Sequence, residues 1–288
     1  MTDFSVVHKG TPLRKLPVHG HTLPEIFQKQ VAKYGHNRTA LRSKKNARWV
    51  DYSWQDYFQH VSCVAAGLRE LGLRAQDKVC ILSSNCPEWV FVCVAAQCLG
   101  AFLVPIYPNN TPEQVKYIVQ HSEARHLFVE NTVQLSKTNH WRNQLPHLEK
   151  TTMIFGTPPA DVMAYDDMAE RGKIECIEHP DFLANQIDQR TPDSPGGIIY
   201  TSGTTGPPKG AILSQLNLVF EATSILTRFD TAYEEDAISF LPLSHIAEQM
   251  PMHRASKPRK MTCLRFDPHS SFPSPACMRR FTPPSWKP

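Results

Sequence analysis

Residues Tyr200 to Gly210 combine the side chains and the backbone freedom that binding an anion requires. The run reads Tyr-Thr-Ser-Gly-Thr-Thr-Gly-Pro-Pro-Lys-Gly. Its glycines let backbone N–H groups approach an anion without interference from a Cβ, and Lys209 adds a compact positive charge suited to phosphate. Hydroxyl donors and glycines fill the rest of the run: Thr201, Ser202, Gly203, Thr204, Thr205, Gly206 and Gly210. The sequence predicts a phosphate-binding loop between a buried strand and a second strand-like run at Ala211–Leu213.

Two other loops that carry glycine are excluded by spacing. A Walker loop has glycine directly before its lysine and Ser or Thr after it, whereas Pro208 and Gly210 stand in those places. A hydrolase nucleophile elbow has glycine two residues before its serine, whereas Tyr200 precedes Ser202 at that distance. The phosphate loop is therefore of a different type.

Short apolar runs alternate with helical patterns along the chain and indicate the fold class. The runs are Val79–Leu82, Phe102–Ile106, Leu127–Val129, Met153–Phe155 and Gly197–Tyr200. The first four begin about 25 residues apart, which is the spacing of βαβ units around a parallel sheet that is buried on both faces. We predict an α/β protein with mostly parallel sheets flanked by helices.

Capping residues predict where three helices begin. Thr22 and Glu25 form a capping-box pattern, Ser53 precedes a long amphipathic stretch that Gly72 ends, and Thr111 precedes a proline. Leu41-Arg42 and Arg48-Trp-Val50 bracket a polar turn and predict a small hairpin.

Charge and proline content change near residue 250. Residues 251–288 hold eight Lys and Arg and one acid, a net charge of +7, so residues 1–250 carry −3 of the total of +4. The body of the chain therefore gives no basic signal for nucleic acid. Eight prolines in the same tail remove backbone donors and fix φ, so we expect it to be disordered, without a regular element. We divide the chain into an N-terminal extension (1–20), one partial domain (21–250) and this Pro/Arg-rich tail.

The cysteines and the apolar stretches predict an intracellular protein. None of the eight cysteines forms a CxxC pair, and several lie in apolar runs, which favours reduced thiols. The N-terminus has no signal-peptide pattern. Residues Trp89 to Tyr107 are long enough to span a membrane, but Gly100 and the strand-like residues after it divide the stretch into a buried helix and a buried strand.

The phosphate loop resembles the signature of the acyl-CoA synthetase, luciferase and peptide-synthetase adenylation superfamily. Further similar segments are Asp51–Trp54, Gln76–Leu82, Asn85–Trp89, Gly100–Pro108 and Phe240–Ile246. The resemblance covers about residues 20–250. The sequence from Leu241 to Gln249 is most similar to that of long-chain fatty acyl-CoA synthetases, including the bubblegum-type branch. It implies that residues 21–250 are part of the large N-terminal AMP-binding domain.

The resemblance implies a two-step ligase reaction and assigns residues to it. A fatty acid carboxylate attacks the α-phosphate of ATP–Mg²⁺ to give acyl-AMP and pyrophosphate, and the thiol of coenzyme A then displaces AMP. Residues Thr201 to Lys209 would hold the β- and γ-phosphates, Lys209 would stabilise the departing pyrophosphate, and the Thr204 hydroxyl would reach the magnesium ion. His245 would orient the carboxylate; the alternative is a partly buried histidine at a strand end. Fatty-acyl substrates also favour peripheral contact with a membrane surface.

Two later elements of the superfamily do not occur in this sequence. They are Tyr-Gly-x-Thr-Glu, which helps to hold magnesium beside the adenine, and Thr-Gly-Asp, which holds the ribose. We therefore expect a truncated chain with weak or no adenylating activity by itself. Two alternatives stay open: a non-catalytic interaction or regulatory fragment of such a synthetase, and adenylation of an aromatic or amino acid.

Overall fold

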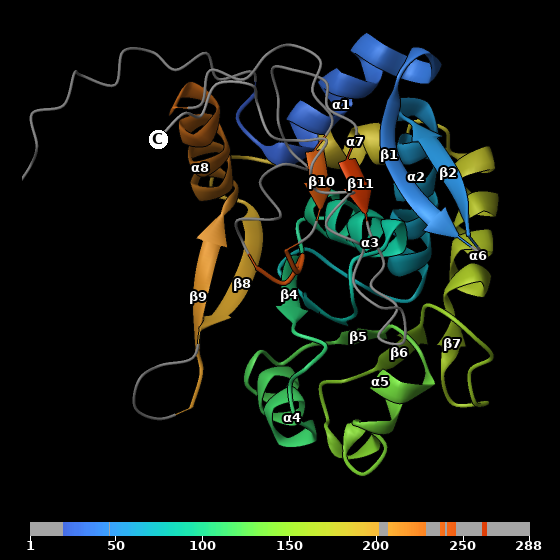
Figure 1. Ribbon diagram of the computed structural model, residues 1–288, viewed down its shortest axis with the longest axis vertical. Helices are drawn as coiled ribbons and strands as arrows, with labels where there is room; N and C mark the ends of the chain where they lie inside the picture. The colour runs from blue at the N-terminus through green and yellow to red at the C-terminus, as the bar shows by residue number, and fades with distance from the viewer. Residues whose placement is uncertain are drawn as a thin grey trace, which may run out of the picture.

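The computed structural model describes residues 20–45, 47–201, 207–228, 237–239, 241–245 and 261–263, and these form two sheets flanked by helices (Figure 1). The larger sheet has the order β7-β6-β5-β3-β4-β8-β9. Its strands are β3 (Lys78–Leu82), β4 (Phe102–Ile106), β5 (His126–Val129), β6 (Lys150–Met153), β7 (Met163–Ala164), β8 (Pro195–Thr201) and β9 (Lys209–Ser214). Every pairing is parallel except that of β8 with β9. The α/β class with a mostly parallel sheet is confirmed.

Alternate residues of the central strands enter two separate hydrophobic cores, which explains their continuous apolar runs. Val79 and Ile81 of β3 face one core, while Cys80 and Leu82 face the other. The first core is filled mainly by α2, α3, α6 and α7, and the second by α4 and the segment around Trp141. A parallel strand that is buried on both faces has no polar side, so it reads as apolar throughout.

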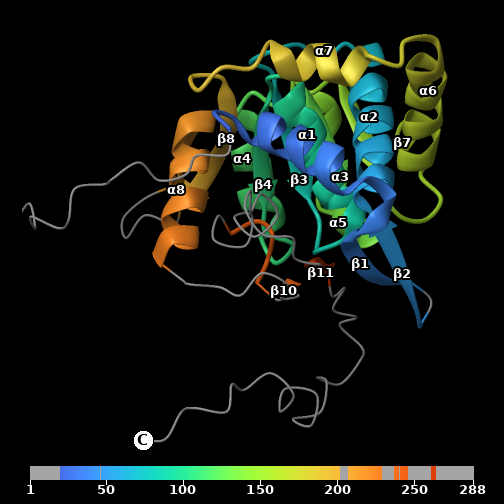
Figure 2. The same ribbon diagram turned by 90° about the horizontal axis from the view of Figure 1, so that it is seen from above.

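Eight α-helices and two 3₁₀ turns lie within the described residues. They are α1 (Leu23–Tyr34), α2 (Trp54–Glu70), α3 (Pro87–Cys98), α4 (Pro112–His121), α5 (Thr132–Ser136), α6 (Tyr165–Glu178), α7 (Phe182–Asp188), α8 (Gln215–Arg228), η1 (Gly35–Asn37) and η2 (Arg142–Gln144). Figure 2 shows α6 beside β7 at one end of the larger sheet and α8 beside β8 at the other.

The three predicted helix starts are confirmed, with one difference in the cap. Ser53 with Asp56 and Thr111 with Gln114 form reciprocal capping boxes. At α1 the Thr22 hydroxyl accepts from Glu25 N, but the Glu25 carboxylate accepts from His21 N at 2.6 Å. The expected box at Thr22 is therefore only half formed, because the acid caps the residue one position earlier.

The membrane-length stretch is divided as expected. All twelve residues of α3 are buried, and β4 begins four residues after this helix ends. Among the described residues we find no helix with the length and apolar character needed to cross a membrane. Cys63, Cys80, Cys86, Cys93, Cys98 and Cys176 are free thiols.

The strand expected at Met153–Phe155 is displaced toward the N-terminus. It is β6, Lys150–Met153, and only Met153 is shared. Thr152 in this strand is fully buried, and its hydroxyl lies 2.8 Å from Nε2 of buried His126 on β5. Thr152 thus occupies a core position that an apolar pattern overlooks, because a paired hydroxyl tolerates burial.

The smaller sheet has the order β10-β11-β1-β2 and contains a strand from the proline-rich tail. Its strands are β1 (Thr39–Lys45), β2 (Arg48–Ser53), β10 (Ala237–Ser239) and β11 (Met261–Cys263). β1 and β2 confirm the expected hairpin. The expectation of a tail without any regular element is wrong at β11, which pairs in parallel with both β1 and β10. Residues 261–263 contain no proline, so each can join a ladder.

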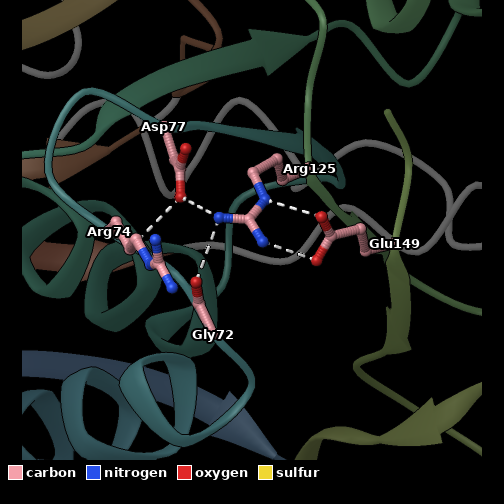
Figure 3. A network of polar contacts seen from close by, with 5 residues as sticks. All are labelled: Gly72, Arg74, Asp77, Arg125 and Glu149. Carbon is pink, nitrogen blue, oxygen red and sulfur yellow. Dashed lines mark hydrogen bonds and ion pairs between the residues drawn. The ribbon is translucent and has the colours of Figure 1, made fainter. Parts of the chain in front are cut away.

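An ion-pair network joins the amino ends of three parallel strands (Figure 3). The guanidinium of Arg125, just before β5, donates to Asp77 Oδ2 at 2.7 Å and to the carbonyl oxygen of Gly72 at 3.1 Å. It also makes two hydrogen bonds, of 3.0 and 2.6 Å, to the Glu149 carboxylate just before β6. Hydrogen bonds from Arg125 lower the pKa of Glu149. The charged side chains at this edge of the sheet are therefore paired with one another.

Candidate functional site

The opposite edge of the sheet brings the chemically informative segments together. β3, β4 and β8 are neighbours in the parallel part of the sheet, so their carboxyl ends meet at one edge. β3 is followed by Asn85, β4 ends at Ile106, and β8 ends at Thr201. Open α/β sheets bind ligands outside the carboxyl ends of their strands. The candidate site lies at this edge.

β8 and β9 form the two limbs of the expected phosphate loop. Thr201 at the end of β8 lies opposite Lys209 at the start of β9, and both side chains are exposed. Ser202, Gly203, Thr204, Thr205 and Gly206 lie outside the described residues, so their predicted contacts with phosphate and magnesium stay predictions. The antiparallel pairing places the hydroxyl-bearing end and the cationic end of the loop side by side.

Close packing explains why residue 210 is a glycine, which the sequence did not indicate. It is part of β9, opposite Tyr200. A Cβ at this position would come within 2.9 Å of Ile198 Cγ2 and 3.2 Å of the Tyr200 ring. The glycine is therefore needed for the two limbs to pack closely.

Two side chains of helix α4 make hydrogen-bond contacts with both limbs of the loop. The Tyr117 hydroxyl donates to the carbonyl oxygen of Pro208 at 3.1 Å, one residue before Lys209. His121 Nδ1 lies 2.8 Å from the Tyr200 hydroxyl, one residue before Thr201. Burial raises the pKa of Tyr200 to about 12, so this hydroxyl keeps its proton at neutral pH. Sequence reasoning missed Tyr117 and His121, because each reads as one more residue of an amphipathic helix.

The segment Leu241–His245 is held at the same edge. Its Leu243 is buried, the Ser244 hydroxyl donates to the carbonyl oxygen of Ile106 at 3.1 Å, and His245 N donates to the carbonyl oxygen of Pro242 at 2.8 Å. The His245 side chain is exposed. The structure therefore places His245 at the end of β4, next in the sheet to the strand that ends in Thr201. The predicted role of His245 toward a carboxylate stays a prediction.

The described residues that could hold a metal ion lie elsewhere. Glu175, Glu178 and His179 at the end of α6 come within 4.8 Å of one another. Glu175 is already paired with Arg69, and the guanidinium of Arg69 stacks 4.1 Å from the Phe182 ring. Glu178 and His179, with Arg69 and Phe182, border a hollow of about 480 Å³ between α6 and α7. Neither feature is part of the carboxyl edge of β3, β4 and β8.

The comparisons with known proteins show the family of this chain. The model of the AMP-binding enzyme family matches residues 27–257, most of the chain. The chain belongs to the AMP-binding enzyme family.

Curated relatives are about one-third identical to this chain over the residues that align. Over 237 residues it is 35% identical to the long-chain-fatty-acid–CoA ligase ACSBG2 of Xenopus laevis, covering 80% of this chain and 31% of that protein. Over 238 residues it is 34% identical to ACSBG1 of Rattus norvegicus, covering 80% of this chain and 32% of that one. The chain thus spans about a third of the length of these relatives.

A solved structure supports the fold. The anthranilate CoA ligase AuaEII, in complex with anthranoyl-AMP, matches with a TM-score of 0.68 and 21% identity, over 85% of this chain and 45% of that one. The resemblance predicted from the phosphate loop, including its bubblegum-type branch, is confirmed by the family model and these relatives.

Proposed function

We propose that this chain carries the phosphate-binding part of a long-chain fatty acid–CoA ligase. In the reaction, the fatty acid carboxylate attacks the α-phosphate of ATP–Mg²⁺, the bond to pyrophosphate breaks, and acyl-AMP forms. The thiol of coenzyme A then attacks the acyl carbon, and AMP leaves. The names of the curated relatives support the choice of acid.

One observation supports the proposal most directly. Across the β8–β9 pair, Thr201 lies opposite Lys209, with a loop rich in glycine and hydroxyl groups between them. Negative charge grows on the departing pyrophosphate, so a positioned cation and several hydroxyl donors are the groups that this step needs. We assign Lys209 to the pyrophosphate oxygens. We assign Thr201, Ser202, Thr204, Thr205 and the backbone of Gly203 and Gly206 to the β- and γ-phosphates.

The remaining roles follow from position and from donor chemistry. Magnesium arrives bound to ATP and prefers oxygen ligands, so the Thr204 hydroxyl is a suitable additional ligand. His245, exposed at the end of β4, is assigned to orient the acyl carboxylate. The proposal places the domain at residues 21–250, and the protein inside the cell, in the cytoplasm or peripherally on a membrane surface.

The proposal is tested by titrating the full chain with ATP–Mg²⁺ in a calorimeter. We expect the wild type to bind and Lys209→Ala to bind at least about tenfold more weakly, because a charge-assisted hydrogen bond contributes about 1.5–3 kcal/mol. Lys209 is exposed, so its removal should leave the fold intact. Lys150→Ala is the matched control, since this exposed lysine begins β6 at the opposite edge of the sheet. Equal affinity in wild type and Lys209→Ala, or no binding by the wild type, would contradict the proposal.

Stable acyl-adenylate analogues test the class of acid. A palmitoyl sulfamoyl-adenosine should bind more tightly than its anthraniloyl counterpart; the reverse order would favour adenylation of an aromatic acid. We expect little ATP–pyrophosphate exchange by the isolated chain, because it contains neither Tyr-Gly-x-Thr-Glu nor Thr-Gly-Asp. If the chain binds no nucleotide but co-purifies with a longer synthetase, the interaction-fragment alternative is favoured.

A further inference from the structure

Asn85 connects the end of a central strand to a segment more than 150 residues away in the sequence. It lies three residues after β3, and only 8% of its surface is exposed. Its Nδ2 donates to Ser239 Oγ at 3.0 Å and to the carbonyl oxygen of Leu241 at 2.7 Å. Its Oδ1 accepts from Leu243 N at 2.7 Å. The NH2 group and the oxygen of this one amide therefore both form hydrogen bonds with the segment that leads to His245.

The three hydrogen bonds specify the path of that segment. They are made to residues on both sides of Pro242, whose ring fixes its own φ and removes a donor. Leu243 is 1% exposed, and the Ser244 hydroxyl bonds to the carbonyl oxygen of Ile106. Together these contacts orient the turn so that His245 follows directly at the exposed edge.

The loop that carries Asn85 is itself fixed to the sheet. Ser84 N donates to Oε2 of Glu130, a buried carboxylate directly after β5, at 3.0 Å. Cys86 caps α3 by accepting from Trp89 N, and Pro87 occupies the first turn of that helix. The residues on both sides of Asn85 are therefore fixed by contacts that do not involve the distant segment.

We propose that Asn85 is a positioning residue for the acyl side of the adenylate site: through its amide it holds Ser239, Leu241 and Leu243, and thereby places His245 beside the phosphate loop. This inference rests on the proposed function. Asn85 acts through the segment and does not contact substrate. The phosphate loop is held separately, by Tyr117 and His121 of α4.

Because the two anchors are separate, two ligands distinguish a positioning role from a general structural one. In the full chain we expect Asn85→Ala to weaken binding of palmitoyl sulfamoyl-adenosine by about tenfold or more, since three buried hydrogen bonds are lost. Binding of magnesium pyrophosphate, which would use the phosphate loop alone, should be unchanged. In the same variant the Leu243 amide should exchange with deuterium about tenfold faster, while the amides of β5 should not change.

Milder and matched variants keep the test decisive. Ser239→Ala removes only one of the three hydrogen bonds and should give a smaller change of the same kind. Asn85→Asp keeps the shape and the acceptor for Leu243 N but loses both donors, so it should also weaken analogue binding. Asn185→Asp, on the exposed face of α7, makes the same change of charge elsewhere and should have no effect.

The outcomes separate this inference from the proposed function. Unchanged exchange at Leu243, or an equal loss of affinity for both ligands, would overturn the role of Asn85. A wild-type chain that binds neither ligand would refute the proposed function and, with it, the role of this segment in binding.

Discussion

At the scale of single residues, the two limbs of the phosphate loop depend on one face of α4. Tyr117 and His121 are one turn apart, their rings stack 5.2 Å apart between centroids, and each reaches one limb. A loop that binds phosphate through its backbone works best when its shape is fixed before the ligand arrives, because ordering it on binding would cost affinity. The Tyr117 hydroxyl is the group that fixes the limb leading to Lys209.

Replacing Tyr117 by Phe tests this role. The ring still packs against His121, but the hydrogen bond to Pro208 is lost, so we expect ATP–Mg²⁺ to bind about fivefold more weakly, as the loss of about 1 kcal/mol implies. Calorimetric titration measures the affinity, and thermal unfolding should be nearly unchanged. Tyr34→Phe makes the same change on α1 and should bind ATP like the wild type. Equal affinity in Tyr117→Phe would mean that α4 does not fix the loop.

At the scale of whole elements, α2 and α6 approach closely through two glycines. A Cβ on Gly172 would overlap the carbonyl oxygen of Cys63 and come within 2.5 Å of Gly67 N. A Cβ on Gly67 would come within 2.5 Å of the Met168 carbonyl oxygen. These atoms belong to the backbone, so neither can move aside as a flexible side chain would.

Gly172→Ala should therefore destabilise the protein, although alanine is the better helix former by about 1 kcal/mol. Forcing the helices apart is expected to lower the free energy of unfolding by about 1–3 kcal/mol. Urea denaturation followed by circular dichroism measures the change. Lys173→Ala, at the next and exposed position of α6, is the control and should stay within about 0.5 kcal/mol of the wild type. A stabilised Gly172→Ala variant would show that the contact is not tight.

At the scale of the whole molecule, the amino ends and the carboxyl ends of the parallel strands carry different kinds of residues. The amino edge of β3, β5 and β6 is closed by Arg125 with Asp77 and Glu149 (Figure 3). The carboxyl edge of β3, β4 and β8 presents the limbs of the loop and His245. Mutations at the first edge should therefore act on stability, and those at the second on binding.

The sequence predicted the local features of this arrangement and missed the distant ones. Caps and apolar runs are patterns of a few residues, so the cap at Ser53 and strand β4 were identified correctly. The role of Lys209 stays a prediction. Asn85 with Leu243 and Tyr117 with Pro208 are contacts across 158 and 91 residues, and nothing within either local pattern indicates the partner. β6 was placed three residues too late because its threonines do not read as an apolar run. β11 was missed because a proline-rich context hides a short strand that pairing with its neighbours stabilises.

Buried His126 links the stability of the whole fold to pH. It is the first residue of β5, stacks on Phe128 with ring centroids 4.7 Å apart, and contacts Thr152. Burial, with a smaller contribution from the charge of Lys150, lowers its pKa from 6.5 to about 3. In the unfolded chain the ring takes up a proton below about pH 6.5, whereas in the folded chain it stays neutral down to about pH 3. The contribution of this group is therefore complete above pH 6.5 and is lost progressively as the pH falls toward 3.

Replacing His126 by Gln should reduce this dependence on pH. Between pH 7.5 and 5.5 the free energy of unfolding of the wild type should fall by about 1 kcal/mol more than that of His126→Gln, because the unfolded wild type alone gains the His126 proton. The amide of Gln can still bond to Thr152, so the variant should fold. Urea denaturation at the two pH values measures the difference, and comparing slopes removes the contribution of other groups, including the lowered pKa of His60. His140→Gln, at an exposed position, should keep the wild-type slope. If His126→Gln also keeps it, the ring must become protonated in the folded sheet, and burial does not hold it neutral.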